Sequence, residues 1–468
     1  MDDAGANRIA VMDIDSISVI DGWFPTVVIV LTIAALLASL GWRATRTRRR
    51  RRSPSSTDDW STPEVRRRPA WRWQLLLGIP IAIALVGLAA LIDDGVSLIP
   101  YQFPNSFYAW FALIPLALAF CVIGWRGAPW WRRAISVISV VLACLFAFTF
   151  VNQHYQYYPN VGALLGKEAQ FEVSDAQLSQ AQADYRKTKQ LPNHGFTISE
   201  TIPGTKSGWH GRPAYIWLPP AWVESPTPEL PVVELLHGSP GSPEDWTRAG
   251  FVDQTAQAYA LAHGGKAPIL VMPDVNGSYL GDTECVDSSL GHAETYVTED
   301  VPAYLRKTFH VSTGPQTMAV AGNSAGGMCA VMLTLRHPDI YTAWGDYAGL
   351  TSPTVSTGVD PAKTTAALFG GDSNEYNEHD PLWLLKNKKF TNVAGWFEVG
   401  TSDTEPLAAQ RTLVPLARAA GVLTCAKEIP GQHDYTFAAQ AFTDSYPWLA
   451  YRLKSGPEPP NAVSICSP

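Results

Sequence analysis

The chain has 468 residues, more than one ordinary domain, and its 46% hydrophobic and 16% charged residues argue against a disordered or nucleic-acid-binding protein. The net charge of −7 is unevenly distributed along it. Residues 1–151 carry 15 Lys and Arg against 10 Asp and Glu, whereas residues 152–468 carry 20 against 32. The sequence therefore divides near residue 151 into a basic part and an acidic part.

The basic part contains four stretches that are long and apolar enough to cross a membrane. None of them contains a charged residue, and each is apolar all round rather than along one stripe. The first is not a cleaved signal peptide, because acidic rather than basic residues precede it. Residues 1–151 are therefore expected to form a membrane anchor with four spans, at about 24–42, 74–92, 107–125 and 134–151.

The arginines predict the orientation of this anchor. Eleven lie between residues 43 and 72, and three more, Arg126, Arg132 and Arg133, follow the third span. The loop between the second and third spans has no basic residue. Since Lys and Arg collect in cytoplasmic loops, the N-terminus and everything after residue 152 are expected to lie outside the cytoplasm. The arginine run could instead bind nucleic acid, but its place beside the spans favours contact with membrane lipid.

Residues 152–205 are expected to be a linker with an amphipathic piece around 173–189. From 206 to 468, short β-branched or aromatic runs alternate with helix-like stretches. This alternation predicts an α/β domain with a mostly parallel sheet and helices on both faces. The candidate strands are 213–219, 231–238, 268–274, 317–323, 342–349, 394–400 and 424–431. In such a sheet, ligands bind at the carboxyl ends of the strands.

The strongest motif is Gly322-Asn323-Ser324-Ala325-Gly326, which closes one predicted strand and opens a helix. A serine in this sharp turn projects its hydroxyl, and the small flanking residues allow a substrate to approach. The alternative is a glycine-rich turn whose serine only caps the helix. The strand and helix on either side favour a nucleophilic Ser324.

A serine nucleophile needs a base and an acid, which follow it in the chain in this arrangement. His433 comes directly after a strand, whereas His337 and His379 do not, so His433 is the expected base; the alternative is a surface histidine. Asp403 follows the strand 394–400 and is the expected acid. Asp403 could instead cap the next helix, and Glu405 is the alternative acid.

The negative charge of an acyl-transfer transition state requires hydrogen-bond donors. The backbone N–H of Ala325 is expected to supply one, because it directly follows the nucleophile. The Ser239 amide, in the loop His237-Gly238-Ser239-Pro240-Gly241 that follows VVELL, is expected to supply the other. His237 begins that loop and is expected to orient it.

Residues 195–453 contain the segments RPAYIWLPPAW, LLHGSPGSPEDW, ILVMPDVNG, GHAETYVTEDVPAYL, VAGNSAGGMCAVMLTLRHP, FEVGTSD and GQHDY. Together they resemble the esterase D and antigen 85-like mycolyltransferase branch of the α/β hydrolases, above all actinobacterial membrane-anchored esterases. The resemblance implies an α/β-hydrolase fold and a triad of Ser324, Asp403 or Glu405, and His433. The loop LLHGSPG differs from the Leu-Asp-Gly run of the mycolyltransferases.

No metal or cofactor is expected. Asp274, Asp282, Glu284 and Asp287 cluster loosely, but their spacing matches no calcium loop, and the chain has no zinc spacing or dinucleotide fingerprint. Outside the spans, Cys285, Cys329, Cys425 and Cys466 could pair as disulfides in three ways, and Cys329 could equally be a packing residue.

The sequence thus predicts an extracytoplasmic serine hydrolase that cleaves acyl esters or lipids through an acyl-enzyme on Ser324. One alternative is an acyltransferase of cell-envelope glycolipids or glycans, which would use the same residues with a sugar hydroxyl in place of water. The other is a membrane scaffold with an inactive hydrolase domain.

Overall fold

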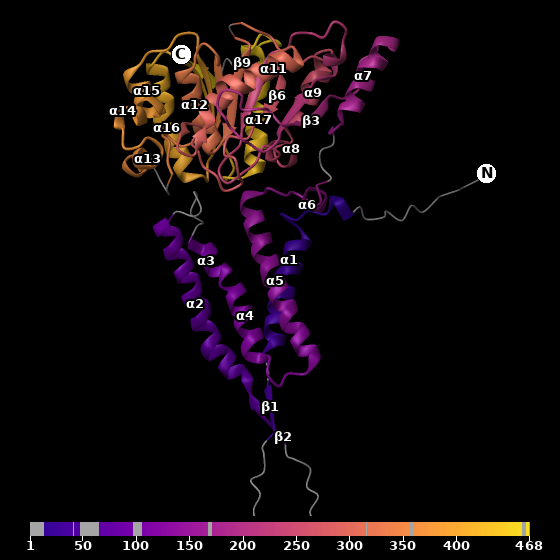
Figure 1. Ribbon diagram of the computed structural model, residues 1–468, viewed down its shortest axis with the longest axis vertical. Coiled ribbons are helices and arrows are strands. Elements are labelled where there is room, and N and C mark those ends of the chain that lie inside the picture. Colours follow the sequence, from indigo (N-terminus) through magenta and orange to yellow (C-terminus); the bar gives the residue numbers. More distant parts are fainter. Residues whose placement is uncertain are drawn as a thin grey trace, which may run out of the picture. The chain divides into compact units, whose positions relative to one another are not determined.

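The computed structural model consists of two compact units (Figure 1). One comprises Met1–Leu98 and Gln102–His154, and the other comprises Ile99–Tyr101 and Tyr155–Pro468. The structure describes residues 14–40, 42–46, 65–96, 105–166, 171–314, 316–355, 360–460 and 465–467.

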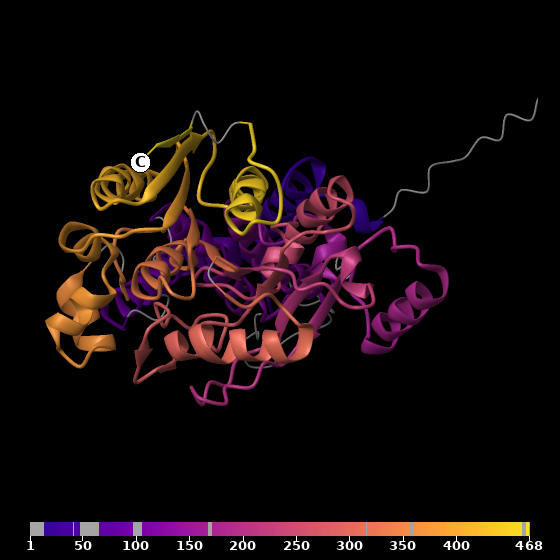
Figure 2. The ribbon, with the colours of Figure 1, turned by 90° about the horizontal axis from the view of Figure 1, so that it is seen from above.

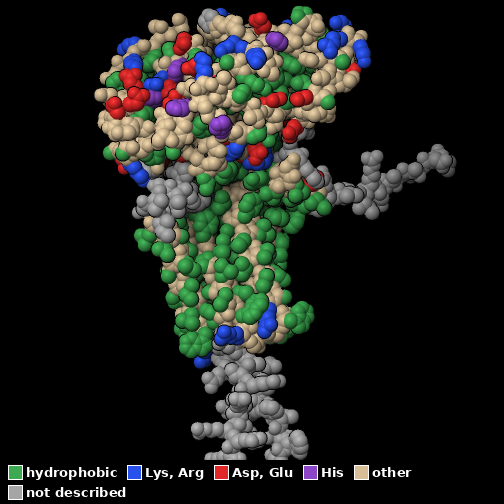
Figure 3. Space-filling view, viewed as in Figure 1, with side chains coloured by type: hydrophobic (Ala, Val, Ile, Leu, Met, Phe, Trp, Pro, Cys, Tyr) green, Lys and Arg blue, Asp and Glu red, His purple; other side chains and the backbone are tan. Residues whose placement is uncertain are grey.

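The first unit is helical. A short 3-10 turn (Ile14–Ser16) precedes its helices, which are α1 (Trp23–Ser39), α2 (Ala70–Val96), α3 (Asn105–Phe111), α4 (Leu113–Gly124) and α5 (Trp130–Tyr155). Large apolar side chains cover the visible surface of these helices (Figure 3), and Leu91 and Val122 are more than 70% exposed. Polar groups lie inside: the buried Gln74 amide donates hydrogen bonds to the carbonyls of Ser39 and Phe120. This inverted distribution is the one that a lipid environment favours.

Three helical segments are long and apolar enough to cross a membrane: Trp71–Leu91, Phe107–Gly124 and Trp130–Tyr155. They correspond to the second, third and fourth predicted spans. The helix at the first predicted span, α1, is apolar but has only 17 residues. Between α1 and α2, β1 (Trp42–Arg46) pairs antiparallel with β2 (Val65–Pro69), which was not expected. Residues 47–64, between β1 and β2, lie outside the described residues.

A nine-stranded sheet organises the second unit, in the order β13-β12-β11-β10-β9-β5-β6-β4-β3. The six strands from β12 to β6 are parallel, so the prediction of a mostly parallel sheet is confirmed. β13, β4 and β3 are antiparallel to their neighbours. The strands are β3 (Phe196–Glu200), β4 (Ala214–Leu218), β5 (Val232–Leu236), β6 (Ile269–Met272), β9 (Met318–Asn323), β10 (Ala343–Tyr347), β11 (Ala394–Gly400), β12 (Leu423–Ile429) and β13 (Cys466–Ser467).

Helices cover both faces of this sheet (Figure 2). Side chains alternate along β5, so Val232 and Leu236 enter one hydrophobic core while Val233 and Leu235 enter the other. The first core is closed by α11 (Val301–Phe309), α12 (Ala325–Arg336) and α16 (Thr404–Ala419), and the second by α8 (Asp245–Arg248), α9 (Val252–Ala262) and α17 (Tyr435–Arg452). Burial on both faces explains why the central strands read as continuous apolar runs.

The remaining elements are short. They are α6 (Val161–Leu164), α7 (Asp175–Thr188), a 3-10 turn (Pro220–Val223), the hairpin β7 (Asp287–Ser288) with β8 (Gly291–His292), α10 (Ala293–Thr295) with the π-helical turn Tyr296–Asp300, α13 (Pro361–Leu368), α14 (Ser373–His379) and α15 (Pro381–Asn387). In the expected linker 152–205, the amphipathic piece forms α7, which starts at a capping box of Ser174 and Gln177. The same segment supplies the edge strand β3.

Two disulfides tie this unit together. Cys285 pairs with Cys329 of α12, and Cys425 of β12 pairs with Cys466 of β13. Of the three connectivities left open by the sequence, the structure contains this one. Cys329 is therefore a cross-link to the helix that follows Ser324, rather than a packing residue alone.

A buried carboxyl group in β5 predicts how stability depends on pH. Glu234 is inaccessible to solvent, and burial raises its pKa to about 8. Between pH 4.5 and 8, the folded protein holds a proton that the unfolded chain has released. The free energy of unfolding therefore falls as pH rises, by up to about 1.4 kcal/mol per pH unit for this group. We expect Glu234→Gln to remove this slope in denaturant titrations of the full chain in detergent.

The exposed Glu229→Gln is the matched control for this titration, and it should keep the slope of the wild type. An unchanged slope in Glu234→Gln would show that Glu234 is ionised in the folded protein.

Candidate active site

Ser324 lies in a strained turn between β9 and α12. Its backbone has φ 60° and ψ −122°, a left-handed conformation that is unfavourable for a serine and is retained where the surrounding structure enforces it. A Cβ on Gly322 would lie 2.2 Å from the carbonyl carbon of Gly326, and a Cβ on Gly326 would lie 2.2 Å from the Leu236 oxygen. Only glycine fits at these two positions. The G-x-S-x-G motif thus has the strand-to-helix context that its sequence predicted.

His433 and Asp403 come from the loops after β12 and β11. His433 Nε2 lies 2.9 Å from Ser324 Oγ, and His433 Nδ1 lies 2.6 Å from Asp403 Oδ2. The His433 and Asp403 side chains are 17% and 11% exposed. Because β9, β11 and β12 are parallel, their carboxyl ends share one edge of the sheet, and residues more than 100 positions apart meet there. The arrangement can withdraw a proton from the serine hydroxyl.

The alternative acid Glu405 and the other two histidines that follow Ser324, His337 and His379, lie away from the contacts between Ser324, His433 and Asp403. Glu405 lies exposed in the first turn of α16, while Asp403 makes the contact with His433. His337 Nε2 and His379 Nε2 lie 2.7 and 2.8 Å from the two carboxylate oxygens of Glu294. Burial raises the pKa of Glu294, but the hydrogen bonds from the two histidines outweigh this effect and hold it below its usual range. These two histidines thus belong to an ion-pair network.

The loop after β5 faces the serine. A Cβ on Gly238 would lie 3.2 Å from Ser324 Cβ, and Ser239 lines the same pocket as Ser324 and His433. Ala325 is the first residue of α12, so its N–H belongs to the turn whose amides have no partner within the helix. The structure therefore brings both expected amide donors, Ser239 and Ala325, next to the serine.

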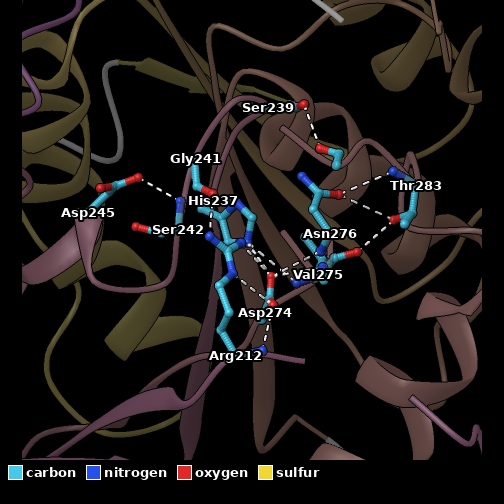
Figure 4. A network of polar contacts seen from close by, with 12 residues as sticks. Arg212, His237, Ser239, Gly241, Ser242, Asp245, Asp274, Val275, Asn276 and Thr283 are labelled. Atoms are coloured by element: carbon cyan, nitrogen blue, oxygen red, sulfur yellow. Dashed lines mark hydrogen bonds and ion pairs between the residues drawn. The ribbon is translucent and has the colours of Figure 1, made fainter. Parts of the chain in front are cut away.

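A buried charged network holds this loop (Figure 4). Asp274, just past β6, accepts hydrogen bonds from Arg212 Nε and Nη2 at 2.9 and 2.7 Å and lies 3.2 Å from His237 Nε2. Arg212 Nη1 donates to the Gly241 carbonyl at 3.0 Å, and Ser239 Oγ donates to the Gly281 carbonyl at 2.8 Å. His237, which was expected to orient the loop, belongs to this network, whereas no sequence motif indicates that Arg212 and Asp274 contact the loop.

Burial raises the pKa of Asp274, but the hydrogen bonds from His237 and Arg212 outweigh this and hold it well below its usual range. The other members of the loose acidic cluster point to other partners. Asp287 accepts hydrogen bonds from Thr295, and burial raises the pKa of Asp282 and of Glu284, which contact each other. Within the described part of the chain, no group of three or more His, Cys, Asp or Glu is arranged to hold a metal ion.

Aromatic residues outside the predicted set complete the pocket. Tyr155, Tyr157 and Tyr435 line it together with Ser324 and His433. Tyr435 is the last residue of the segment GQHDY, which contains His433, and it could have been predicted from that segment. Tyr155 and Tyr157 lie near the end of the last apolar stretch, where tyrosines are typical of a membrane interface, so their place in this pocket could not be predicted from the sequence.

Comparisons with known proteins identify similar chains. The chain is 28% identical over 404 residues to an uncharacterized protein of Corynebacterium glutamicum, covering 83% of this chain and 91% of that protein. It is 24% identical over 191 residues to S-formylglutathione hydrolase of Bos taurus, covering 37% of this chain and 63% of that one. A solved ferulic acid esterase aligns with a TM-score of 0.49 at 21% identity, over 56% of this chain and 99% of its own.

One family model matches residues 210–449, just over half of the chain, and its description is "Putative esterase". The matched region runs from the turn before β4 into α17 and includes the serine turn, the loop after β5 and the His433 loop. The chain therefore belongs to this esterase family and has an α/β-hydrolase fold.

Proposed function

We propose that this protein is a membrane-anchored serine esterase that cleaves carboxylic esters outside the cytoplasm. The observation that carries the proposal is the continuous chain of contacts from Ser324 Oγ through the His433 imidazole to the Asp403 carboxylate, at 2.9 and 2.6 Å. Membership of the esterase family supports the same chemistry. Ser324, His433 and Asp403 would act as nucleophile, base and acid.

In the proposed reaction, Ser324 Oγ attacks the ester carbonyl carbon while its proton moves to His433 Nε2. Asp403 accepts a hydrogen bond from Nδ1–H and stabilises the imidazolium. The amides of Ser239 and Ala325 would donate to the oxyanion. The intermediate then expels the alcohol, which takes the proton from His433 and leaves an acyl-enzyme. A water molecule, deprotonated by His433, attacks the acyl carbonyl; His433 then returns the proton to Ser324 Oγ as the bond to the acyl carbon breaks, and the carboxylic acid is released.

Three observations support a membrane anchor and a catalytic domain outside the cytoplasm. Three helical segments are long and apolar enough to span a membrane, and the shorter α1 would be the fourth span, so that the anchor occupies residues 1–151. The arginine-rich loops would face the cytoplasm. The disulfides Cys285–Cys329 and Cys425–Cys466 suit an oxidising compartment. Reporter fusions at residue 60 and at the C-terminus should report cytoplasmic and external positions, and a cytoplasmic C-terminus would refute the location.

Activity is tested with purified protein in detergent and a chain-length series of p-nitrophenyl esters, with and without sugar acceptors. We expect free acid as the product in both conditions. Acyl-sugar in excess of free acid would instead support an acyltransferase. If no ester in the series is cleaved and a fluorophosphonate does not label the protein, the result would support the alternative of a membrane scaffold with an inactive hydrolase domain.

The contacts of Arg212 and Asp274 hold the loop after β5, His237–Gly241, which is called the oxyanion loop below, and these contacts are called the clamp. They lead to a further prediction. Asp274→Asn leaves Arg212 and His237 without their carboxylate, so the loop that carries Ser239 should loosen. We expect kcat to fall about 10- to 100-fold, less than the 10²- to 10³-fold cost of removing an oxyanion donor outright, because the Ser239 amide stays in the loop, and the unfolding free energy to fall by about 3 to 5 kcal/mol. Both are measured with the soluble ester assay and denaturant titration.

Asp287→Asn is the control for this substitution, because Asp287 lies in the same chain segment but is partly exposed, accepts hydrogen bonds from Thr295 and lies 3.7 Å from His292 Nδ1, away from the loop after β5. It should change kcat less than twofold. A wild-type kcat in Asp274→Asn would show that the clamp does not position the loop.

A further inference from the structure

Tyr155 and Tyr157, at and just after the end of α5, form a wall of the catalytic pocket, and their neighbours Gln156 and Tyr158 help to hold it. Tyr155 and Tyr157 line the pocket beside Ser324 and His433. The Tyr157 ring packs against Tyr435, with centroids 5.3 Å apart. A segment that only linked the catalytic domain to the anchor would not need to line the pocket of the catalytic serine.

Specific contacts fix this wall to the catalytic machinery. Tyr157 Oη donates to the Pro240 carbonyl at 2.8 Å, next to the proposed oxyanion residue Ser239. Arg248 Nε donates to the Tyr157 carbonyl at 3.3 Å, and its guanidinium lies 4.4 Å from the centre of the Tyr158 ring.

Gln156 adds contacts on the other side of the pocket. Its amide nitrogen lies 3.4 Å from Asp434 Oδ2, one residue after His433, and its amide oxygen accepts from Thr436. The segment therefore holds both the oxyanion loop and the His433 loop.

Chain length limits how far this wall can lie from the anchor. The fourth apolar stretch ends at Val151, α5 ends at Tyr155, and Tyr157 follows two residues later. Four helical residues and two extended ones span about 13 Å, and six fully extended residues span about 20 Å. The headgroup layer on each side of a bilayer is about 5 to 8 Å thick. With Val151 at the hydrocarbon boundary, the chain holds Tyr157 within about 20 Å of that boundary, so the pocket wall stays in the headgroup layer or within about 15 Å of it.

We propose that this wall fixes the catalytic pocket at the membrane surface, so that the substrates are acyl esters of membrane-resident lipids, reached at the level of their headgroups. The proposal rests on the esterase function above. The tyrosines suit such a place, because each has an apolar ring and a polar hydroxyl. A lipid ester would present its carbonyl at the pocket while its hydrocarbon chains stay in the bilayer, whereas a water-soluble ester would gain nothing from the tether.

The test separates the pocket from the anchor without altering the wall. A ten-residue Gly-Ser insertion between His154 and Tyr155 adds about 17 to 19 Å of flexible reach. The matched control carries the same insertion between Lys189 and Gln190, which are exposed in the coil after α7. Each full-length protein is reconstituted into phosphatidylglycerol vesicles that contain a diacylglycerol with one fluorogenic acyl ester, and it is also assayed with soluble p-nitrophenyl acetate. Rates are divided by the amount of protein that a fluorophosphonate labels, so that misfolded protein does not count.

We expect the His154–Tyr155 insertion to lower the vesicle rate about tenfold and to change the soluble rate less than twofold, while the control insertion changes neither. Tyr157→Ala, which removes the wall, should raise KM for the vesicle ester at least fivefold, and Tyr157→Phe, which keeps the ring, should restore most of this loss. Equal vesicle rates in the insertion variant and the wild type, or a wild type that cleaves only the soluble ester, would overturn the proposal while leaving the esterase function intact. Absence of both labelling and soluble activity in the wild type would refute the esterase function itself.

Discussion

Replacing Ser324 by alanine is expected to lower kcat for p-nitrophenyl ester hydrolysis by about four to six orders of magnitude. The substitution removes the only protein atom in the proposed mechanism that forms a covalent bond to the substrate, and loss of a catalytic serine costs about 10⁶-fold in comparable hydrolases. The unfolding free energy should change little, because the alanine removes a single oxygen. Steady-state kinetics and denaturant titration of the full-length protein check both expectations.

Ser402→Ala is the control for this experiment. Ser402 is an exposed serine beside Asp403, and its replacement should leave kcat within twofold of the wild type. A Ser324→Ala protein that keeps more than about one per cent of the wild-type kcat would contradict a serine mechanism.

The second large effect is expected at the acid. Asp403→Asn keeps the shape of the side chain but removes the charge that stabilises the His433 imidazolium, and the amide favours the wrong tautomer of the ring. We expect kcat to fall about 10⁴-fold, as in a serine protease with the corresponding change. The measurement is kcat for the same ester across pH 6 to 9.

Glu405→Gln serves as the matched comparison, since Glu405 is the neighbouring acid in the chain and lies exposed. It should change kcat less than threefold. If the two effects were reversed, with Glu405→Gln the larger, Glu405 rather than Asp403 would be the acid.

Much of the fold could be predicted from the sequence because the central strands are buried on both faces. All seven candidate strands appear in the sheet within one or two residues of their expected ends. The edge strands β3 and β13 were missed for different reasons. β3 contains polar as well as apolar residues and follows a polar segment, and β13 has only two residues, one of them held by the disulfide Cys425–Cys466.

The candidate site followed from topology. Side chains past the ends of parallel strands meet at one edge, so Ser324 and His433 could be paired without a structure. The choice between Asp403 and Glu405 could not be made in this way, because two residues of chain do not decide which carboxylate reaches the imidazole. The clamp between Arg212 and Asp274 joins positions 62 residues apart, and neither follows from a motif. The place of Tyr155 and Tyr157 in the pocket could not be predicted, because tyrosines at the end of an apolar stretch are equally typical of a membrane–water interface.

The central claim, that Ser324 is the nucleophile of an enzyme facing away from the cytoplasm, is tested most directly by a charged, membrane-impermeant fluorophosphonate. Intact cells that express the wild type or Ser324→Ala are treated with the probe, and the labelled peptides are identified by mass spectrometry. We predict an adduct on the peptide containing Ser324 in intact wild-type cells, and none in the Ser324→Ala protein. An adduct on another residue would contradict the proposed nucleophile, labelling only after lysis would contradict the location, and no adduct in either condition would contradict the enzyme.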